Sequence, residues 1–307
     1  MISAECWIGI IRRFLGRSSG MVARTGIGWF GRRIVVMRSG SGPKEHKLVG
    51  CRRLHDEVDR GLRLKWSPEQ ISARLVVAHA GDAEMRVSHE TIYQSLYLQA
   101  RGVLRTELTL ALRQGRAKRV SRSRVSWSKG KIRGMVNVSE RPAEAADRAV
   151  PGFWEGDLII GKANASQIAT LVERTTRFTM LVRIPYDRSA ERVAKLLAMK
   201  METLPELMRK SVTWDQGKEM ARHADFSVST GIDVYFCDPH SPWQRGTNEN
   251  TNGLLRQYFP KGTDLSLHTQ AYLDMVAEEL NDRPRKTLGW QKPVEVFAEL
   301  LENSVSL

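Results

Sequence analysis

Cysteine is scarce in this chain of 307 residues, and its three copies, Cys6, Cys51 and Cys237, are widely separated. An odd number of scattered cysteines excludes a disulfide framework and indicates a reducing compartment. The seven histidines form no zinc-ligand spacing with them. No apolar run approaches the length of a membrane-spanning helix, and the opening MISAECWIGIIRR has no basic residue ahead of its very short apolar patch. We therefore expect a cytoplasmic protein with no membrane partner.

Acidic residues are scarce only in the first half of the chain. Residues 1–150 hold 29 Lys and Arg against 13 Asp and Glu, a net charge of +16, whereas residues 151–307 hold 19 against 21, a net charge of −2. A strong positive excess indicates a polyanionic partner such as nucleic acid. The length exceeds one ordinary core and predicts two or more domains. We expect a DNA-binding half joined to a separate folded core.

The first 48 residues show no clean periodicity. Gly and Arg are frequent, and only the segment FLGRSSGMVAR vaguely resembles the second helix of a helix-turn-helix. We interpret residues 1–48 as an atypical N-terminal segment that holds a remnant of such a motif.

Residues 49–112 predict a helix-turn-helix-like DNA-binding domain. An amphipathic helix at RRLHDEVDRGLRLKW precedes two capped helices, over about 67–79 and 89–99, the first opened by a capping box of Ser67 and Gln70. The second helix of such a pair enters the major groove, so His89, Thr91 and Gln94 are candidate base contacts. A plain helical hairpin is the alternative, because the turn AGDAEMR is longer than the usual three or four residues.

Residues 113–148 predict a basic linker. Its first part, 113–133, carries nine Lys and Arg, no acid and too few apolar residues for a core. Such a segment either lies along DNA phosphates or is a solvated spacer. The candidate phosphate contacts are Arg116, Lys118, Arg119, Arg122 and Arg124.

From about residue 150 the pattern changes to short β runs and helices in the order β-β-β-α-β-α-β-α. The predicted elements are strands at 154–161, 168–176, 177–185, 211–215 and 233–238, and helices at 189–204, 218–230 and 241–259, followed by two further helices after Leu265. The second and third strands are expected to form a hairpin.

Two acids stand in or beside the predicted strands. Asp157 lies in FWEGDLIIG and Asp215 in VTWDQGKEM. Acids are poor strand formers, and a divalent metal that takes carboxylate oxygens is a common reason for one there. Glu155 shares a strand face with Asp157 because side chains alternate, so it is a second-choice ligand. Asp238, at another strand end, is a lesser candidate.

A third acid, Glu249, lies in the predicted helix within CDPHSPWQRGTNENTNGLLRQYFPKG, which Ser241 is expected to cap. Arg245 and Arg256 stand four residues before it and seven after it, offsets that return to one helix face. On this stretch alone, a solvated row of salt bridges is the simpler interpretation.

The sequence segments EGDLIIGK, TWDQGKEMA and CDPHSPWQRGTNENTNGLLRQYFPKGTD resemble those of a bacterial DDE transposase of the insertion-sequence-thirty family. The resemblance runs from about Trp66 to about Leu300. It implies an α/β fold in which a ribonuclease-H-like mixed-sheet catalytic core, residues 149–307 with C-terminal helices, follows an all-α helix-turn-helix-like DNA-binding region. Family members normally begin with an intact helix-turn-helix, from which residues 1–48 depart.

The resemblance also implies the chemistry. Asp157, Asp215 and Glu249 would be catalytic carboxylates that hold Mg²⁺, for which Mn²⁺ substitutes. Two such ions about 4 Å apart can stabilise the attacking and leaving oxygens of phosphodiester transfer. Water would first free a 3′-hydroxyl, which would then attack another phosphodiester. The implied partners are double-stranded DNA, as terminal inverted repeats and target, and further copies of the chain on DNA at the bacterial nucleoid.

Four residues near Glu249 complete the predicted site. Arg245 and Arg256 resemble family positions that touch DNA phosphates, and Asn248 and Asn252 are expected to hydrogen-bond the scissile DNA end. Two other functions stay open from the sequence. One is a catalytically inactive or truncated transposase that acts only as a DNA-binding protein, and the other is a structure-selective nuclease.

Overall fold

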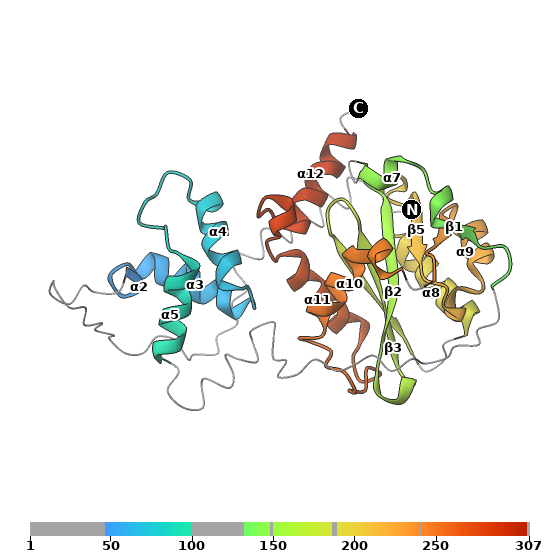
Figure 1. The fold of residues 1–307 in the computed structure, drawn as a ribbon, viewed down its shortest axis with the longest axis horizontal. Helices are drawn as coiled ribbons and strands as arrows, with labels where there is room; N and C mark the ends of the chain where they lie inside the picture. The colour runs from blue at the N-terminus through green and yellow to red at the C-terminus, as the bar shows by residue number, and fades with distance from the viewer. Residues whose placement is uncertain (1–46, 100–131, 148–149, 186–188, 240, 306–307) are drawn as a thin grey trace. The chain divides into compact units, whose positions relative to one another are not determined.

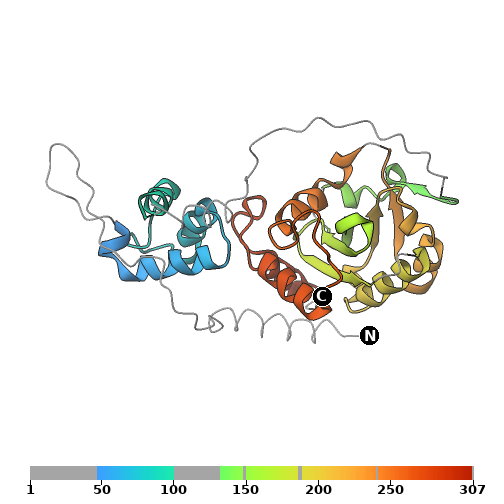
Figure 2. The same cartoon turned by 90° about the horizontal axis from the view of Figure 1, so that it is seen from below.

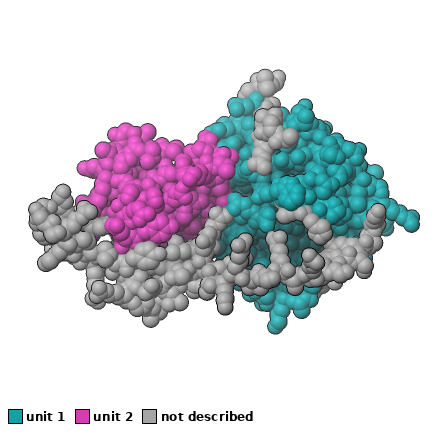
Figure 3. Space-filling model, viewed as in Figure 1, with its two compact units in different colours: residues 1–19, 121–282, 293–307 teal, residues 20–120, 283–292 magenta. Residues whose placement is uncertain are grey.

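The computed structural model of the chain describes residues 47–99, 132–147, 150–185, 189–239 and 241–305 (Figure 1). These residues form two compact units (Figure 3). The smaller unit contains residues 47–99 and 283–292, and the larger contains 132–282 and 293–305. Residues 1–46 of the predicted N-terminal segment and the candidate phosphate contacts from Arg116 to Arg124 lie outside the described residues.

The smaller unit is helical. Its helices are α2 (Lys47–Gly50), α3 (Arg52–Arg63), α4 (Pro68–Ala78) and α5 (His89–Gln99). The predicted capping box at the start of α4 is confirmed, because the Ser67 hydroxyl accepts from the amide of Gln70 and the Gln70 side chain accepts from the amide of Ser67. One apolar cluster, which includes Leu54, Val58 and Ile92, holds the helices together.

A segment from the C-terminal part of the chain completes the smaller unit. Residues 283–292, with the 3-10 helix η6 (Lys286–Leu288), pack against the start of α4. Gln70 Nε2 donates to the Pro284 carbonyl at 2.8 Å, and Lys286 Nζ lies 2.9 Å from Glu69 Oε1. The ammonium of Lys292 lies over the Trp66 ring, 5.5 Å from its centroid.

The larger unit is built on a six-stranded mixed sheet with the strand order β1-β6-β5-β2-β3-β4. The strands are β1 (Val136–Asn137), β2 (Phe153–Ile160), β3 (Gln167–Glu173), β4 (Thr179–Ile184), β5 (Ser211–Trp214) and β6 (Asp233–Phe236). Strands β2, β3 and β4 are antiparallel neighbours, whereas β5 and β6 run parallel to β2. This arrangement confirms the predicted ribonuclease-H-like fold class. Strand β1, parallel to β6, was not predicted.

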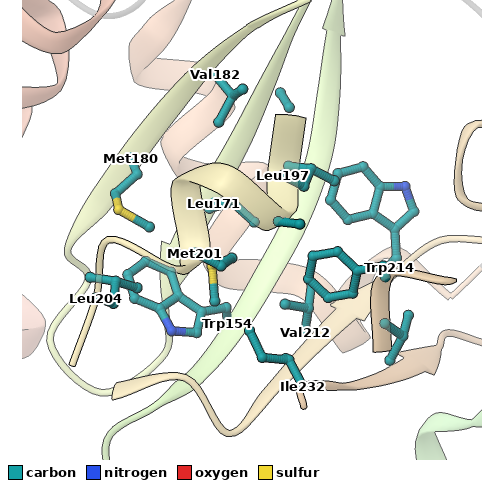
Figure 4. Packing of buried hydrophobic residues seen from close by; sticks show 14 of the residues in the cluster. Trp154, Leu171, Met180, Val182, Leu197, Met201, Leu204, Val212, Trp214 and Ile232 are labelled. Atoms are coloured by element: carbon teal, nitrogen blue, oxygen red, sulfur yellow. The ribbon is translucent and has the colours of Figure 1, made fainter. Parts of the chain in front are cut away.

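Helices cover both faces of the sheet (Figures 1 and 2). On one face, α8 (Ala190–Met201), α9 (His223–Thr230) and α12 (Pro293–Val305) enclose the larger core, in which Trp154 and Trp214 pack among aliphatic side chains and methionines (Figure 4). On the other, α10 (Gly246–Leu255) and α11 (Gln270–Asn281) pack against Ile159, Ile168 and Leu181. The remaining short helices are α7 (Glu144–Asp147), η1 (Val138–Glu140), η2 (Lys162–Asn164), η3 (Glu206–Met208), η4 (Lys218–Met220) and η5 (Pro242–Arg245).

Two predicted helices differ from the structure. The helix expected over 218–230 is divided into η4 and α9. The helix that carries Glu249 does not start at Pro242, because Pro242–Arg245 forms a 3-10 turn and the α-helix begins at Gly246. The prediction that Ser241 caps this helix is wrong, since its side chain makes no capping hydrogen bond. Proline at the start suits a 3-10 turn as well as an α-helix, which is why the sequence pattern did not separate them.

Candidate active site

The register of the central strands brings Asp157 and Asp215 together. Strand β2 runs parallel to β5 with Glu155 opposite Thr213, and the two aspartates each stand two residues further along. Neighbouring strands lie about 4.8 Å apart, and residues two apart in a strand share a face. Both acids therefore lie on the face of the sheet that α10 covers.

Arg245, at the junction of η5 and α10, binds both aspartates. Its Nη1 lies 3.3 Å from Asp157 Oδ1, and its Nη2 lies 3.4 Å from Asp215 Oδ2. Nη1 also donates to the Gly156 carbonyl at 2.8 Å. One guanidinium thus lies between the carboxylate of Asp157, within β2, and that of Asp215, which directly follows β5.

Charge and burial shift the pKa values of this cluster. Burial raises the pKa of Asp157 above its ordinary value, and the charge of Asp215 raises it further, while Arg245 opposes both effects. Burial alone would lower the pKa of Arg245, but the charges of Asp157 and Asp215 outweigh that effect and raise it. The guanidinium is therefore the counter-charge that stabilises two adjacent carboxylates.

Helix α10 presents further polar groups to Asp157. Asn252 Nδ2 donates to Asp157 Oδ2 at 2.9 Å. Glu249 stands between Arg245 and Asn252 in the helix, at offsets of four and three that place all three on neighbouring positions of one face, and its side chain is exposed. Arg256 follows at the end of the helix, where its Nη1 donates to the Phe259 carbonyl at 3.3 Å. Burial lowers the pKa of Arg256, and the charge of Asp157 acts in the opposite direction.

Asn248 is not positioned to contact DNA in this structure. Its side chain is fully buried, its Nδ2 donates to the Glu155 carbonyl at 2.9 Å, and its Oδ1 accepts from Thr170 Oγ1 at 2.9 Å. The sequence interpretation failed because an asparagine in a polar helix stretch is ordinarily exposed. Asn252 is half-buried and keeps one amide hydrogen bond to an acid of the predicted site.

The residues around Asp157 fit a hydrated divalent cation. Two carboxylates already converge on one positive group, and Asn252 Oδ1 is a buried acceptor without a hydrogen-bond partner. Mg²⁺ takes carboxylate oxygens and keeps several water molecules, which would donate to such an acceptor. Within the described residues, no group of three or more His, Cys, Asp or Glu side chains is close enough to hold a metal as it stands. Asp157, Asp215 and Glu249 would hold the ion only after Glu249 turns towards the two aspartates.

The two competing acids have other surroundings. Glu155 is fully buried, with its Oε1 3.4 Å from Nε of Arg174. Asp238 is exposed beyond β6, where its Oδ1 accepts from Asn137 Nδ2 and its Oδ2 accepts from Gln244 Nε2. These hydrogen bonds lower the pKa of Asp238. Both acids therefore have partners that explain them without a metal.

Two arginines near the site, Arg174, which is buried, and Arg141, which is half-buried, were missed from the sequence. Arg174 is buried beside Glu155, and Arg141 donates through Nη1 to Thr213 Oγ1 at 3.0 Å. Burial and the nearby charge of Arg174 lower the pKa of Arg141 to about 10. Neither residue has a sequence signal, since arginines in charged turns are ordinarily exposed.

The candidate base contacts of the smaller unit lie on α5. His89 and Gln94 are exposed, whereas the Thr91 hydroxyl is half-buried and hydrogen-bonded to Ser88 Oγ at 2.8 Å. His89 Nε2 lies 3.4 Å from Glu90 Oε1. The helix thus offers two of the three predicted side chains on its surface.

The family model for the integrase core domain matches residues 147–242, which hold both aspartates. A mixed sheet of this topology, with one acid in a central strand and another just after the neighbouring strand, together with that match, defines a nucleic-acid-processing enzyme of the transposase and integrase class.

Comparison with similar transposases identifies the family within this class. The transposase for insertion sequence element IS1086 of Cupriavidus metallidurans is 53% identical over 78% of this chain and 70% of its own length. The transposase InsI for insertion sequence element IS30A of Escherichia coli is 43% identical over 96% of this chain and 80% of its own. The transposase for IS4351 of Bacteroides fragilis is 36% identical over 86% and 78%. The chain belongs to the IS30 family of insertion-sequence transposases. Among the described residues, no helix is long and apolar enough to cross a membrane.

Proposed function

We propose that this chain binds the terminal inverted repeats of an insertion sequence and catalyses Mg²⁺-dependent cleavage of the DNA end followed by strand transfer. The observation that supports this function best is the convergence on one cationic group of Asp157, within β2, and Asp215, just after the neighbouring strand β5. Two carboxylates held this close favour a bound cation, because each raises the cost of ionising the other.

Each residue of the site has a role in the proposed reaction. Asp157, Asp215 and Glu249 would hold the cation, and Mn²⁺ would replace Mg²⁺. When bound, the cation would stabilise negative charge on the scissile phosphate. Asn252 would orient water through its unpaired Oδ1, and Arg245 and Arg256 would attract DNA phosphates. Water would cleave one phosphodiester to free a 3′-hydroxyl, which would then attack a second phosphodiester.

The proposed partners follow from the same reaction. His89, Thr91 and Gln94 would read the terminal repeat in the major groove, and Arg116, Lys118, Arg119, Arg122 and Arg124 would contact phosphates. Two DNA ends have to be joined to one target, so we propose that several copies of the chain assemble on DNA. Such an enzyme would work in the bacterial cytoplasm, at the nucleoid.

The test is incubation of the purified protein with a labelled terminal repeat, in Mg²⁺ and then in EDTA, beside two variants. Asp157→Asn should abolish nicking, whereas Asp225→Asn, which alters an exposed acid on α9, should leave it unchanged. Nicking by Asp157→Asn at the parental rate would refute the assigned acids. Repeat-specific binding without product in Mg²⁺ or Mn²⁺ would favour a DNA-binding protein, and nicking without strand joining would favour a nuclease.

A further inference from the structure

Glu155 is an acid in the middle of strand β2 that the fold buries completely, at 0% exposure. Burial of a carboxylate is costly unless charge and hydrogen bonds compensate it. The compensation comes from two directions. Arg174 Nε lies 3.4 Å from Oε1, and the backbone amide of Asn248 donates to Oε2 at 2.9 Å.

The amide of Asn248 belongs to the first turn of α10, which begins at Gly246. The first amides of an α-helix have no partner within the helix and are ordinarily capped by a side chain just before it. Helix α10 has Arg245 in that position, which makes no side-chain capping bond. Glu155 therefore supplies from a β-strand the cap that the local sequence lacks, and its negative charge suits a helix N-terminus.

Three consecutive residues of β2 bind α10 or its N-cap residue, Arg245. Glu155 binds Asn248, the Gly156 carbonyl binds Arg245, and Asp157 binds Asn252. Residues two apart in a strand are separated by about 6.6 Å, and residues four apart in a helix by about 6 Å. The spacings match, so the contacts of Glu155 and Asp157 form together, and a rotation or shift of the helix would break both.

We propose that Glu155 is a positioning residue for the transposition reaction, which fixes α10 so that Glu249 lies on the helix face of Asn252, the residue that binds Asp157, and can turn towards the two aspartates. Glu249 directly follows the capped residue Asn248, so the cap sets the direction of the turn from which Glu249 projects. Glu155 is not a metal ligand, because it is fully buried with Arg174 and Asn248 as its partners. The inference rests on the proposed function, since it assigns Glu249 to the same site as the aspartates.

Two paired substitutions test this role. Glu155→Gln with Arg174→Gln removes both charges and keeps an oxygen for the Asn248 amide. Glu155→Leu with Arg174→Met removes the charges and the acceptor, and replacement of a buried ion pair by apolar side chains preserves folding in other proteins. Circular dichroism and thermal unfolding would establish that both proteins fold.

The Gln pair should nick within about threefold of the parental rate. The Leu/Met pair should lose roughly 100-fold in single-turnover rate while the KM for DNA stays within about twofold. In the Leu/Met background, Glu249→Gln should cause no further loss, although it is severe in the parent. Mn²⁺ titration should show parental affinity in the Gln pair and a loss in Asp157→Asn. A Gln pair that lost Mn²⁺ affinity as Asp157→Asn does would overturn the proposal, because Glu155 would then be a ligand.

Hydrogen exchange decides the positioning role even if the parent shows no nicking. The amides at residues 246–249 should be protected in the parent and in the Gln pair, and should exchange at least tenfold faster in the Leu/Met pair. Unchanged protection in the Leu/Met pair would overturn the positioning role. Absent nicking in the parent would refute only the proposed function.

Discussion

The substitution Arg245→Gln tests two effects of the guanidinium between Asp157 and Asp215. The guanidinium should stabilise the metal-free protein, and it should compete with a divalent cation for the two carboxylates. The substitution removes a guanidinium that lies 3.3 Å and 3.4 Å from the two carboxylates. An effective dielectric constant of about 20 gives a gross attraction of roughly 5 kcal/mol for each pair. The net contribution is smaller, because the side chains of Asp157 and Asp215 are 30% and 41% exposed. Exposed ion pairs contribute about 0–1 kcal/mol, whereas loss of one partner of a buried pair costs about 3–5 kcal/mol.

We therefore expect Arg245→Gln to destabilise the metal-free protein by about 2 kcal/mol, between those limits. For a unit of this size, that loss lowers the melting temperature by roughly 4–8 °C. A divalent cation should then bind more tightly than in the parent, since it no longer competes with the guanidinium. A tenfold gain in affinity would add about 1.4 kcal/mol of stabilisation at saturating metal.

Differential scanning calorimetry in EDTA and in a series of Mn²⁺ concentrations measures both effects. Arg256→Gln is the matched control, because Arg256 lies at the other end of α10 and donates to a backbone carbonyl. It should leave the increase in melting temperature on addition of Mn²⁺ at the parental value. The reasoning is refuted if Mn²⁺ raises the melting temperature of Arg245→Gln no more than that of the parent. Asp157→Asn added to Arg245→Gln should abolish the Mn²⁺ effect.

Three further predictions concern the larger unit. Gly156→Ala should lower the free energy of unfolding by roughly 1–3 kcal/mol, because a Cβ there would collide with the Trp214 ring. Thermal unfolding should show a lower melting temperature together with a change in tryptophan fluorescence. An unchanged melting temperature would contradict this prediction. Burial raises the pKa of Glu173, so stability should fall as pH rises above the ordinary glutamate pKa, where only the unfolded chain has lost its proton, and Glu173→Gln should flatten that slope in denaturant titrations from pH 5 to pH 8. An equal slope in both proteins would refute this. Cys237 is buried, and burial raises its pKa to about 11, so its thiol should not react with iodoacetamide at pH 8 in the native protein. Peptide mapping should find Cys237 unmodified in the native protein and modified after unfolding. Rapid labelling of the native protein would contradict its buried state.

Elements with a strong apolar pattern were predictable from the sequence. The runs that became β2, β3 and β4 are apolar enough to identify each strand, and the Ser67 capping box identified the start of α4. Strand β1 has only two residues, too few for any periodicity. The strand order was not predictable either, because the pairing of β2 with β5 depends on contacts between residues about 58 apart.

The polar interior was harder to predict for a physical reason. A sequence pattern predicts that charged and amide side chains lie on the surface, where they keep their contact with water and no desolvation penalty arises. Arg174 and Asn248 are buried because each has a partner, Glu155 and Thr170 respectively, in a strand of the sheet that is distant from it in the sequence. The candidate acids were found because an aspartate within an apolar strand is unusual, whereas the residues that balance them lie in segments whose composition is ordinary.

Charge balance in the proposed site links Arg245 to DNA. With the acids ionised, Asp157, Asp215 and Glu249 carry −3 and Arg245 carries +1, which leaves a net charge of −2 in the cation-free protein. One divalent cation balances that charge, and a second would leave an excess of +2. A scissile phosphate brings negative charge to the same place, so Arg245 can exchange its carboxylate partners for a phosphate as the cations bind. On this reasoning, DNA should increase the affinity of the parent for Mn²⁺, and by linkage Mn²⁺ should increase its affinity for DNA by the same factor. Arg245→Gln should reduce that coupling.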